Sequence, residues 1–181
     1  MISGMYLGEI LRNILLHLID SNLLFSGRHS TVLNTHYGLD TAVMSDLEAG
    51  PASPPANNLS QDGQKPSASS DTARLREIIR TQLEIEEKYI SDEDCLLVLR
   101  ASELVGTRGA RLSGAAIAAV FKQTKSETSG EDFLVGVDGS LVEFYPRFEE
   151  RVRVALRASL GKDEPRVKIG LAKDGSGVGG E

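Results

Sequence analysis

The chain has 181 residues, of which 40% are hydrophobic and 25% charged, a composition typical of a globular protein. Its formal net charge of −6 and its pI near 5.2 argue against a nucleic-acid partner, because binding to phosphates needs a basic surface. The single cysteine, Cys95, excludes an intramolecular disulfide and favours a reducing, cytoplasmic setting. It lies in an apolar run, which predicts a buried and inert thiol.

The first 25 residues are apolar enough to suggest a membrane or signal segment. However, Glu9, Arg12 and Asp20 interrupt the apolar stretch, and no basic leader precedes it. Its apolar residues recur at helical spacing: Leu7, Ile10, Leu11, Ile14, Leu18 and Ile19. We therefore predict an amphipathic helix packed on a protein core, and no membrane association.

Residues 22–49 are mixed in character and predict a loop with short extended pieces. Residues 50–71 are rich in Pro, Ser, Asn and Gln and almost lack apolar side chains. Such a stretch cannot bury enough surface to offset its ordering entropy, which predicts a disordered insertion at 50–71. Because both flanks look core-packed, we expect the insertion to lie within one domain that spans 1–181.

Helical periodicity resumes at Thr72, and Ser91 with Asp94 predicts a capped start for a long helix from 92 to about 122. Small residues are frequent in the second half of that helix: Gly106, Gly109, Gly114, Ala115, Ala116, Ala118 and Ala119. This composition predicts close packing against a neighbouring element.

Residues 133–138 and 141–144 flank Gly139-Ser140, which predicts a β-hairpin. A helix is expected from Pro146 to about Leu160, with the proline in its first turn, and a buried strand at 167–172. Helices that alternate with strands indicate an α/β fold, with an incomplete sheet because so few strands are present.

Three glycines near the end, Gly175, Gly177 and Gly180, match the pattern Gly-x-Gly-x-x-Gly after a strand. A dinucleotide-binding fingerprint would continue into a helix and an acidic residue, which do not follow here. Glycines still allow a phosphate or a flat ligand to approach backbone amides. The alternative is a strand-to-helix turn that binds no ligand.

Several segments, taken in order, resemble the hexokinase family, in particular fungal-type hexokinases and glucokinases. They are ISGMYLGEILRNILL at 2–16, NLLF at 22–25, LDTAVMS at 39–45, ELVGTRGAR at 103–111, VGVDGS at 135–140 and KDGSG at 173–177. The resemblance implies the large lobe of an actin-like ATPase fold, which is related to ribonuclease H. It also implies transfer of the γ-phosphoryl group of ATP, with Mg²⁺ held through the nucleotide, to the 6-hydroxyl of glucose.

The resemblance also implies which residues contact the nucleotide. It places Gly4 and Met5 near the nucleotide, and Thr41 and Ser45 at the adenosine and phosphates. It places Ser140 at a phosphate. The residues against the adenosine are Gly175, Ser176, Gly177 and Gly179. Hydroxyl-bearing and small residues suit phosphoryl transfer, which depends on positioning and charge stabilisation. Met5 departs from the family, because many relatives have a lysine there and others an aromatic residue.

The family's catalytic aspartate and its sugar-binding residues precede the position that matches Met1. The resemblance therefore implies no catalytic residue in this chain, an internal methionine at Met1, and no activity of the chain alone. Two alternatives to an active parent enzyme stay open: a non-catalytic hexokinase-like sensor, and a regulatory or interaction protein.

Overall fold

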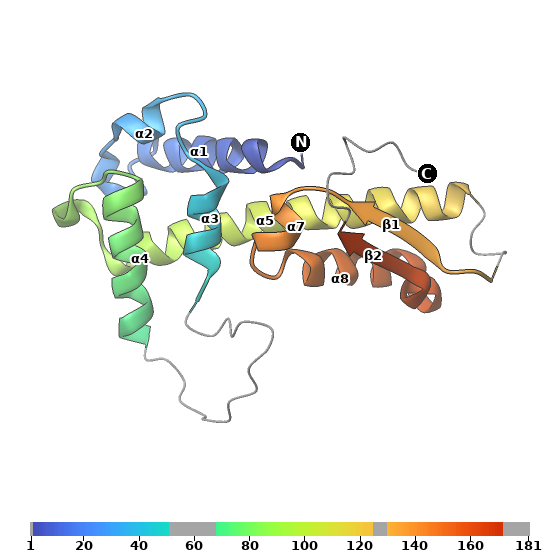
Figure 1. Ribbon diagram of the computed structural model, residues 1–181. Helices are drawn as coiled ribbons and strands as arrows, with labels where there is room; N and C mark the ends of the chain where they lie inside the picture. Colours follow the sequence, from blue (N-terminus) through green and yellow to red (C-terminus); the bar gives the residue numbers. More distant parts are fainter. Residues whose placement is uncertain (1, 51–67, 125–129, 172–181) are drawn as a thin grey trace. The chain divides into compact units, whose positions relative to one another are not determined.

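The computed structural model describes residues 2–50, 68–124 and 130–171 (Figure 1). The chain divides into two compact units, residues 4–105 and residues 106–181 together with 1–3. The long helix α5 (Asp92–Gln123) contributes its first part to one unit and its remainder to the other.

The 4–105 unit begins with helix α1 (Gly4–Asp20), which has one fully buried face. Its core residues recur every four positions, Leu7, Leu11, Leu15 and Ile19, and each is at most 1% exposed. The predicted amphipathic helix is therefore confirmed. Leu15 takes the buried place on this face, whereas Ile14, which we expected there, is 37% exposed.

The expectation of loop and extended pieces over 22–49 is wrong, because most of this segment is helical. It forms a 3-10 helix η1 (Phe25–Gly27), a short helix α2 (Thr31–Asn34) and helix α3 (Thr41–Glu48). The side chain of Ser30 accepts the amide hydrogen of Leu33 at 3.2 Å, and that of Asp40 accepts the amide hydrogen of Ala42 at 2.8 Å. These two caps satisfy amide groups that have no partner within the helix.

Helix α4 (Ala68–Gln82) starts four residues before the predicted Thr72 and contacts α3. Arg74 on α4 donates a hydrogen bond to the carbonyl oxygen of Leu47 at 3.0 Å, near the end of α3. Residues 68–71, the last four of the predicted disordered insertion, belong to this helix, so the prediction is wrong there. Most of the remaining insertion, residues 51–67, lies outside the described part of the chain. Both helices that flank it belong to the same compact unit.

The capped start of α5 is confirmed, after the 3-10 helix η2 (Glu87–Tyr89). The Ser91 hydroxyl accepts from the Asp94 amide at 3.1 Å, and the Asp94 carboxylate accepts from the Ser91 amide at 2.8 Å. Asp94 also accepts the Phe25 amide hydrogen at 3.1 Å, which ties η1 to this helix start. One carboxylate thus serves both the cap and the packing of the unit.

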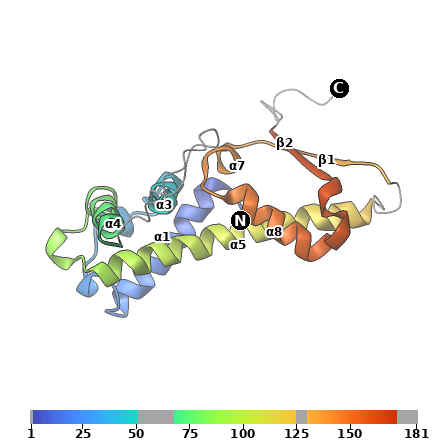
Figure 2. The ribbon, with the colours of Figure 1, turned by 90° about the horizontal axis from the view of Figure 1, so that it is seen from below.

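The other unit contains strands β1 (Phe133–Val137) and β2 (Val167–Leu171), which pair in parallel with Phe133 opposite Val167. Helices α7 (Ser140–Phe144) and α8 (Phe148–Leu160) and the 3-10 helix η3 (Gly161–Arg166) connect them. Figure 2 shows the two strands side by side. Within the described residues the sheet has these two strands, which agrees with the expected incomplete α/β sheet.

The predicted hairpin at 133–144 is therefore wrong. Gly139 has a φ of 121° and leads the chain into α7 instead of back along β1. Few residues other than glycine adopt this conformation. The strand that pairs with β1 is far along the sequence, as parallel pairing requires.

The predicted close packing of α5 is confirmed at Gly114. A Cβ atom on Gly114 would lie 2.7 Å from the Cβ of Ala155 on α8 and 2.9 Å from the carbonyl oxygen of Val152. Helix α8 itself begins at Phe148, two residues after Pro146, so the proline precedes the helix and is not in its first turn. Ala115, Ala116 and Ala119 are exposed, so only part of the small-residue set serves this contact.

Candidate functional site

The amino-terminal ends of α1 and α3 meet at the hydroxyl of Thr41. This hydroxyl accepts the amide hydrogen of Gly8 at 3.1 Å and donates to the carbonyl oxygen of Gly4. Gly4 and Gly8 are one helical turn apart, so the threonine bridges two backbone groups of the first turn of α1. We call Gly4, Gly8 and Thr41 the α1–α3 junction.

The absence of a side chain at Gly8 makes the α1–α3 junction possible. A Cβ atom there would lie 2.2 Å from the carbonyl oxygen of Leu39 and 3.2 Å from the backbone nitrogen of Thr41. The backbone before α3 therefore rests directly on α1, and this contact places the Thr41 side chain at the first turn.

Met5 and Ser45, two further predicted nucleotide contacts, belong to the same two helices. Met5 follows Gly4 and is 61% exposed. Ser45 is half-buried and lies four residues after Thr41, so the two share one face of α3. Four of the predicted site residues therefore lie on α1 and α3 of one compact unit.

The other predicted site residues are not brought to this junction by the structure. Ser140 begins α7 in the other compact unit, so its place relative to Thr41 stays a prediction. Gly175, Ser176, Gly177 and Gly179 lie outside the described residues, and their contact with adenosine stays a prediction as well.

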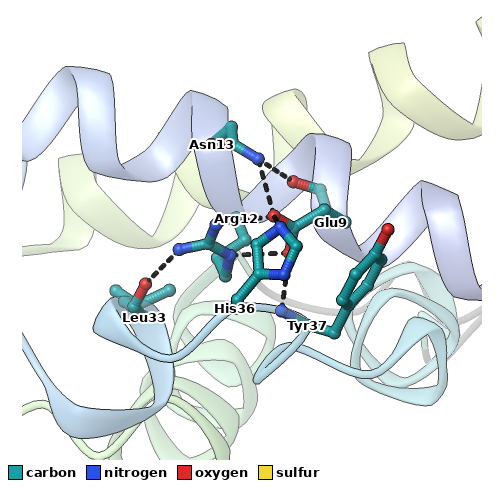
Figure 3. A network of polar contacts seen from close by, with 6 residues as sticks. All are labelled: Glu9, Arg12, Asn13, Leu33, His36 and Tyr37. Carbon is teal, nitrogen blue, oxygen red and sulfur yellow. Dashed lines mark hydrogen bonds and ion pairs between the residues drawn. The ribbon is translucent and has the colours of Figure 1, made fainter.

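A buried polar network beside the junction was not predicted from the sequence (Figure 3). The guanidinium of Arg12 donates to both carboxylate oxygens of Glu9, at 2.7 and 2.6 Å, and to the carbonyl oxygen of Leu33 at 2.7 Å. Glu9 also accepts the amide hydrogen of Tyr37 at 2.9 Å. We call Glu9 and Arg12, with these contacts, the Glu9–Arg12 clamp, because it attaches α1 to residues 33–37.

A sequence signal for the Glu9–Arg12 clamp did exist. Glu9 and Arg12 are three residues apart, a spacing at which side chains on a helix meet. Both fall on the buried face of α1, where they are 8% and 6% exposed. Helical periodicity alone marks them only as polar interruptions of an apolar segment. Charged residues on a buried face are rarely found without partners, and this rule would have indicated the pair.

The charges of the Glu9–Arg12 clamp are stabilised by its own hydrogen bonds. The hydrogen bonds from Arg12 lower the pKa of Glu9 to about 2, against burial, which raises it, and with help from the Tyr37 amide and the Asn13 side chain. The same contact with Glu9 raises the pKa of Arg12. Both groups therefore stay charged near neutral pH, which suits a structural role and not proton transfer.

Other candidate chemistry lies away from this junction. Cys95 is fully buried, as predicted, and burial raises the pKa of its thiol, which disfavours a reactive thiolate. Within residues 2–50, 68–124 and 130–171, no three His, Cys, Asp or Glu side chains form a group that could hold a metal ion. None of the helices in these ranges has the length and apolar character needed to span a bilayer.

Solved structures identify the class of fold. The structure superposes on a hexokinase from Schistosoma mansoni complexed with glucose, with a TM-score of 0.71, 28% identity, and coverage of 94% of this chain and 32% of that one. A second hexokinase crystal structure matches with a TM-score of 0.74 at 22% identity, over 96% of this chain and 33% of the other. The fold is therefore that of one part of a hexokinase.

Sequence relatives give the same result. The hexokinase family model matches residues 1–180, and the chain belongs to the hexokinase family. It is 33% identical to Hexokinase-2 of Schizosaccharomyces pombe over 178 residues, which cover 98% of this chain and 34% of the relative. It is 34% identical to a glucokinase of Aspergillus niger over 191 residues, 98% of this chain and 35% of the relative. The chain thus spans about a third of the length of these relatives.

Proposed function

We propose that this chain forms part of the nucleotide-binding side of an ATP-dependent hexose kinase of the cytoplasm. The reaction is transfer of the γ-phosphoryl group of ATP to the 6-hydroxyl of glucose or a related hexose. The observation that carries the proposal is the α1–α3 junction, where Gly4, Gly8 and Thr41 meet in a member of the hexokinase family. A relative named as a glucokinase and a structural neighbour complexed with glucose support a hexose as the acceptor.

The chemistry of the α1–α3 junction fits the adenosine part of the nucleotide better than the phosphates. The single hydroxyl proton of Thr41 is donated to Gly4, so a ligand can only donate to this oxygen. Ribose hydroxyls and the adenine amino group are donors, whereas ionised phosphate oxygens are not. The carboxylate of Asp40 caps α3 directly beside Thr41 and would repel a phosphate.

The resemblance implies that Thr41 and Ser45 contact both the adenosine and the phosphates, and the proposal here is more specific. In the proposed site these two residues contact adenosine, and the triphosphate extends away from Asp40. Ser140 is proposed to contact a phosphate, and Mg²⁺ is proposed to arrive with the nucleotide and to be held through its phosphates.

A nucleotide titration of the ¹⁵N-labelled chain tests the proposal. We expect ATP and adenosine to shift the amide signals of Gly4, Thr41 and Ser45, and pyrophosphate to leave these signals unchanged. Shifts centred on residues 84–94, or no shifts with ATP or adenosine, would contradict the nucleotide-binding role.

A coupled glucose-phosphorylation assay tests the other part of the proposal, namely that the 181-residue chain alone is inactive. A chain that lacks the catalytic base would neither position nor deprotonate the 6-hydroxyl. Turnover above the background rate would show that this chain contains its own catalytic residues.

A further inference from the structure

We infer that Glu9 is a positioning residue for the proposed site: it holds Tyr37 in a left-handed backbone conformation and thereby lays residues 39–41 on α1. The inference rests on the proposed function, because the position of Thr41 matters for binding only if Thr41 contacts a nucleotide.

The argument starts from the backbone of Tyr37. Its φ is 59°, in the left-handed region that residues other than glycine rarely adopt. The amide hydrogen of this same residue is donated to the Glu9 carboxylate at 2.9 Å. A charge-assisted hydrogen bond of this kind is stronger than one between neutral groups, so Glu9 stabilises Tyr37 in its unfavourable conformation.

The turn at Tyr37 decides where the following residues lie. Two residues after Tyr37, the carbonyl oxygen of Leu39 lies so close to Gly8 that a Cβ atom on Gly8 would be 2.2 Å from it. Two residues further, the hydroxyl of Thr41 enters the first turn of α1. Without the left-handed residue the chain would leave α1 in another direction, and the α1–α3 junction would not form.

Glu9 can perform this role because its own side chain is immobilised. Both carboxylate oxygens are engaged by Arg12, and the Asn13 side chain donates to one of them at 3.1 Å. Arg12 is in turn held by the carbonyl oxygen of Leu33. The carboxylate is therefore a rigid acceptor, fixed at the place where the Tyr37 amide arrives.

Helix α4 provides a matched control. Glu77 and Arg80 have the same three-residue spacing and the same two contacts, at 2.9 and 2.6 Å. Their side chains are 58% and 46% exposed, whereas those of Glu9 and Arg12 are 11% and 8% exposed. Glu77→Gln therefore removes a similar ion pair without touching the α1–α3 junction.

The experiment compares the wild-type chain with Glu9→Gln, Tyr37→Gly, the double variant and Glu77→Gln. Two quantities are measured for each: the Kd for ATP, and the nuclear Overhauser contacts between the Thr41 methyl and the Gly8 α protons. We expect Glu9→Gln to weaken ATP binding by about fivefold or more and to lose the Thr41–Gly8 contacts, with Glu77→Gln like wild type. The double variant should recover most of both losses, because glycine adopts the left-handed conformation without strain.

Unchanged ATP affinity and unchanged contacts in Glu9→Gln would overturn the inference. So would a double variant no better than Glu9→Gln, since Glu9 would then only stabilise the fold. If Glu9→Gln does not fold, Glu9→Asp is measured in its place, because it keeps the charge beside Arg12 but shortens the reach to Tyr37. Absence of ATP binding in the wild-type chain would contradict the proposed function, whereas the Thr41–Gly8 contacts would still decide whether Glu9 positions Thr41.

Discussion

A Cβ atom on Gly8 would lie 2.2 Å from the carbonyl oxygen of Leu39, so α1 and the segment before α3 meet backbone to backbone. The amide of the same glycine donates to the hydroxyl of Thr41. Gly8 therefore contributes to the α1–α3 junction in two ways: it leaves room for the Leu39 backbone, and its amide donates a hydrogen bond to Thr41.

Gly8→Ala should destabilise the 4–105 unit by about 2 kcal/mol, because the backbone atoms of Leu39 cannot move aside without shifting the whole segment. This cost exceeds the gain in helix propensity, which is about 1 kcal/mol. Urea unfolding measures the difference. Gly50→Ala is the control, since a Cβ there meets nothing within 4 Å among the described residues. Equal effects of the two changes would disprove the steric argument.

Thr41→Val keeps the shape of the side chain but removes the hydroxyl. The Gly8 amide and the Gly4 carbonyl then lose a partner, which should cost about 1–2 kcal/mol of unfolding free energy. We expect this variant also to lose the adenosine-induced shifts around Ser45, whereas Thr41→Ser keeps them. If Thr41→Val binds adenosine as the wild type does, the hydroxyl is not a ligand contact.

The Glu9–Arg12 clamp predicts a specific pH dependence. The pKa of Glu9 is lowered in the folded chain to about 2 from an ordinary 4.5, so folding favours the ionised form. Its contribution to stability is therefore complete above about pH 4.5 and is lost as the pH falls towards 2. The difference in unfolding free energy between wild type and Glu9→Gln should therefore shrink as the pH falls from about 4.5 towards 2. A difference that grows as the pH falls would mean that the carboxyl is protonated in the folded chain.

Gly114→Val should destabilise the unit that contains α8 by about 2 kcal/mol, because the new side chain meets Ala155 and the backbone of Val152. Hydrogen exchange at the amides of α8 (Phe148–Leu160) measures the effect. Gly170→Ala in β2 serves as a control, since a Cβ there would meet no non-neighbouring atom within 4 Å in the part of the chain that the structure describes. Unchanged exchange in Gly114→Val would show that α5 and α8 are not packed at this glycine.

Gly177→Val tests the remaining part of the nucleotide site, which lies outside the described residues. The glycine turn is expected to approach adenosine closely, so a branched side chain should weaken ATP binding without changing the charge. Thermal unfolding is recorded beside the titration to separate binding from folding. A folded Gly177→Val chain with wild-type affinity would show that the glycine turn is not part of the adenosine site.

Local signals in the sequence predicted the long helices well. The start of α5 followed from Ser91 and Asp94, whose reciprocal hydrogen bonds the structure confirms. The buried face of α1 followed from apolar residues at helical spacing, and strand β2 from a short apolar run. The expectation that this strand is buried is wrong in part, because Lys168 and Gly170 are exposed. These features depend on neighbours in the chain, so a pattern of nearby residues is enough to indicate them.

The candidate site was predicted only in part. The resemblance to hexokinases supplied Gly4, Met5, Thr41 and Ser45, and the structure places them on the facing helices α1 and α3. Glu9 was missed, because its importance depends on the amide of a residue 28 positions away. Periodicity says which face of a helix is buried, but it cannot say which backbone group will arrive opposite a buried carboxylate.

By itself, the sequence determined the helices with strong periodicity and caps, the α/β class and the membership of the hexokinase family. Tertiary structure decided that residues 140–144 form a helix, that β1 pairs in parallel with β2, and that Tyr37 adopts a left-handed conformation. The run at 141–144 is too short for its periodicity to distinguish a strand from a helix. Gly139, with a φ of 121°, leads the chain into this helix. The conformation of Tyr37 depends on a hydrogen bond to Glu9, 28 residues away, which exceeds the small local preferences of the chain.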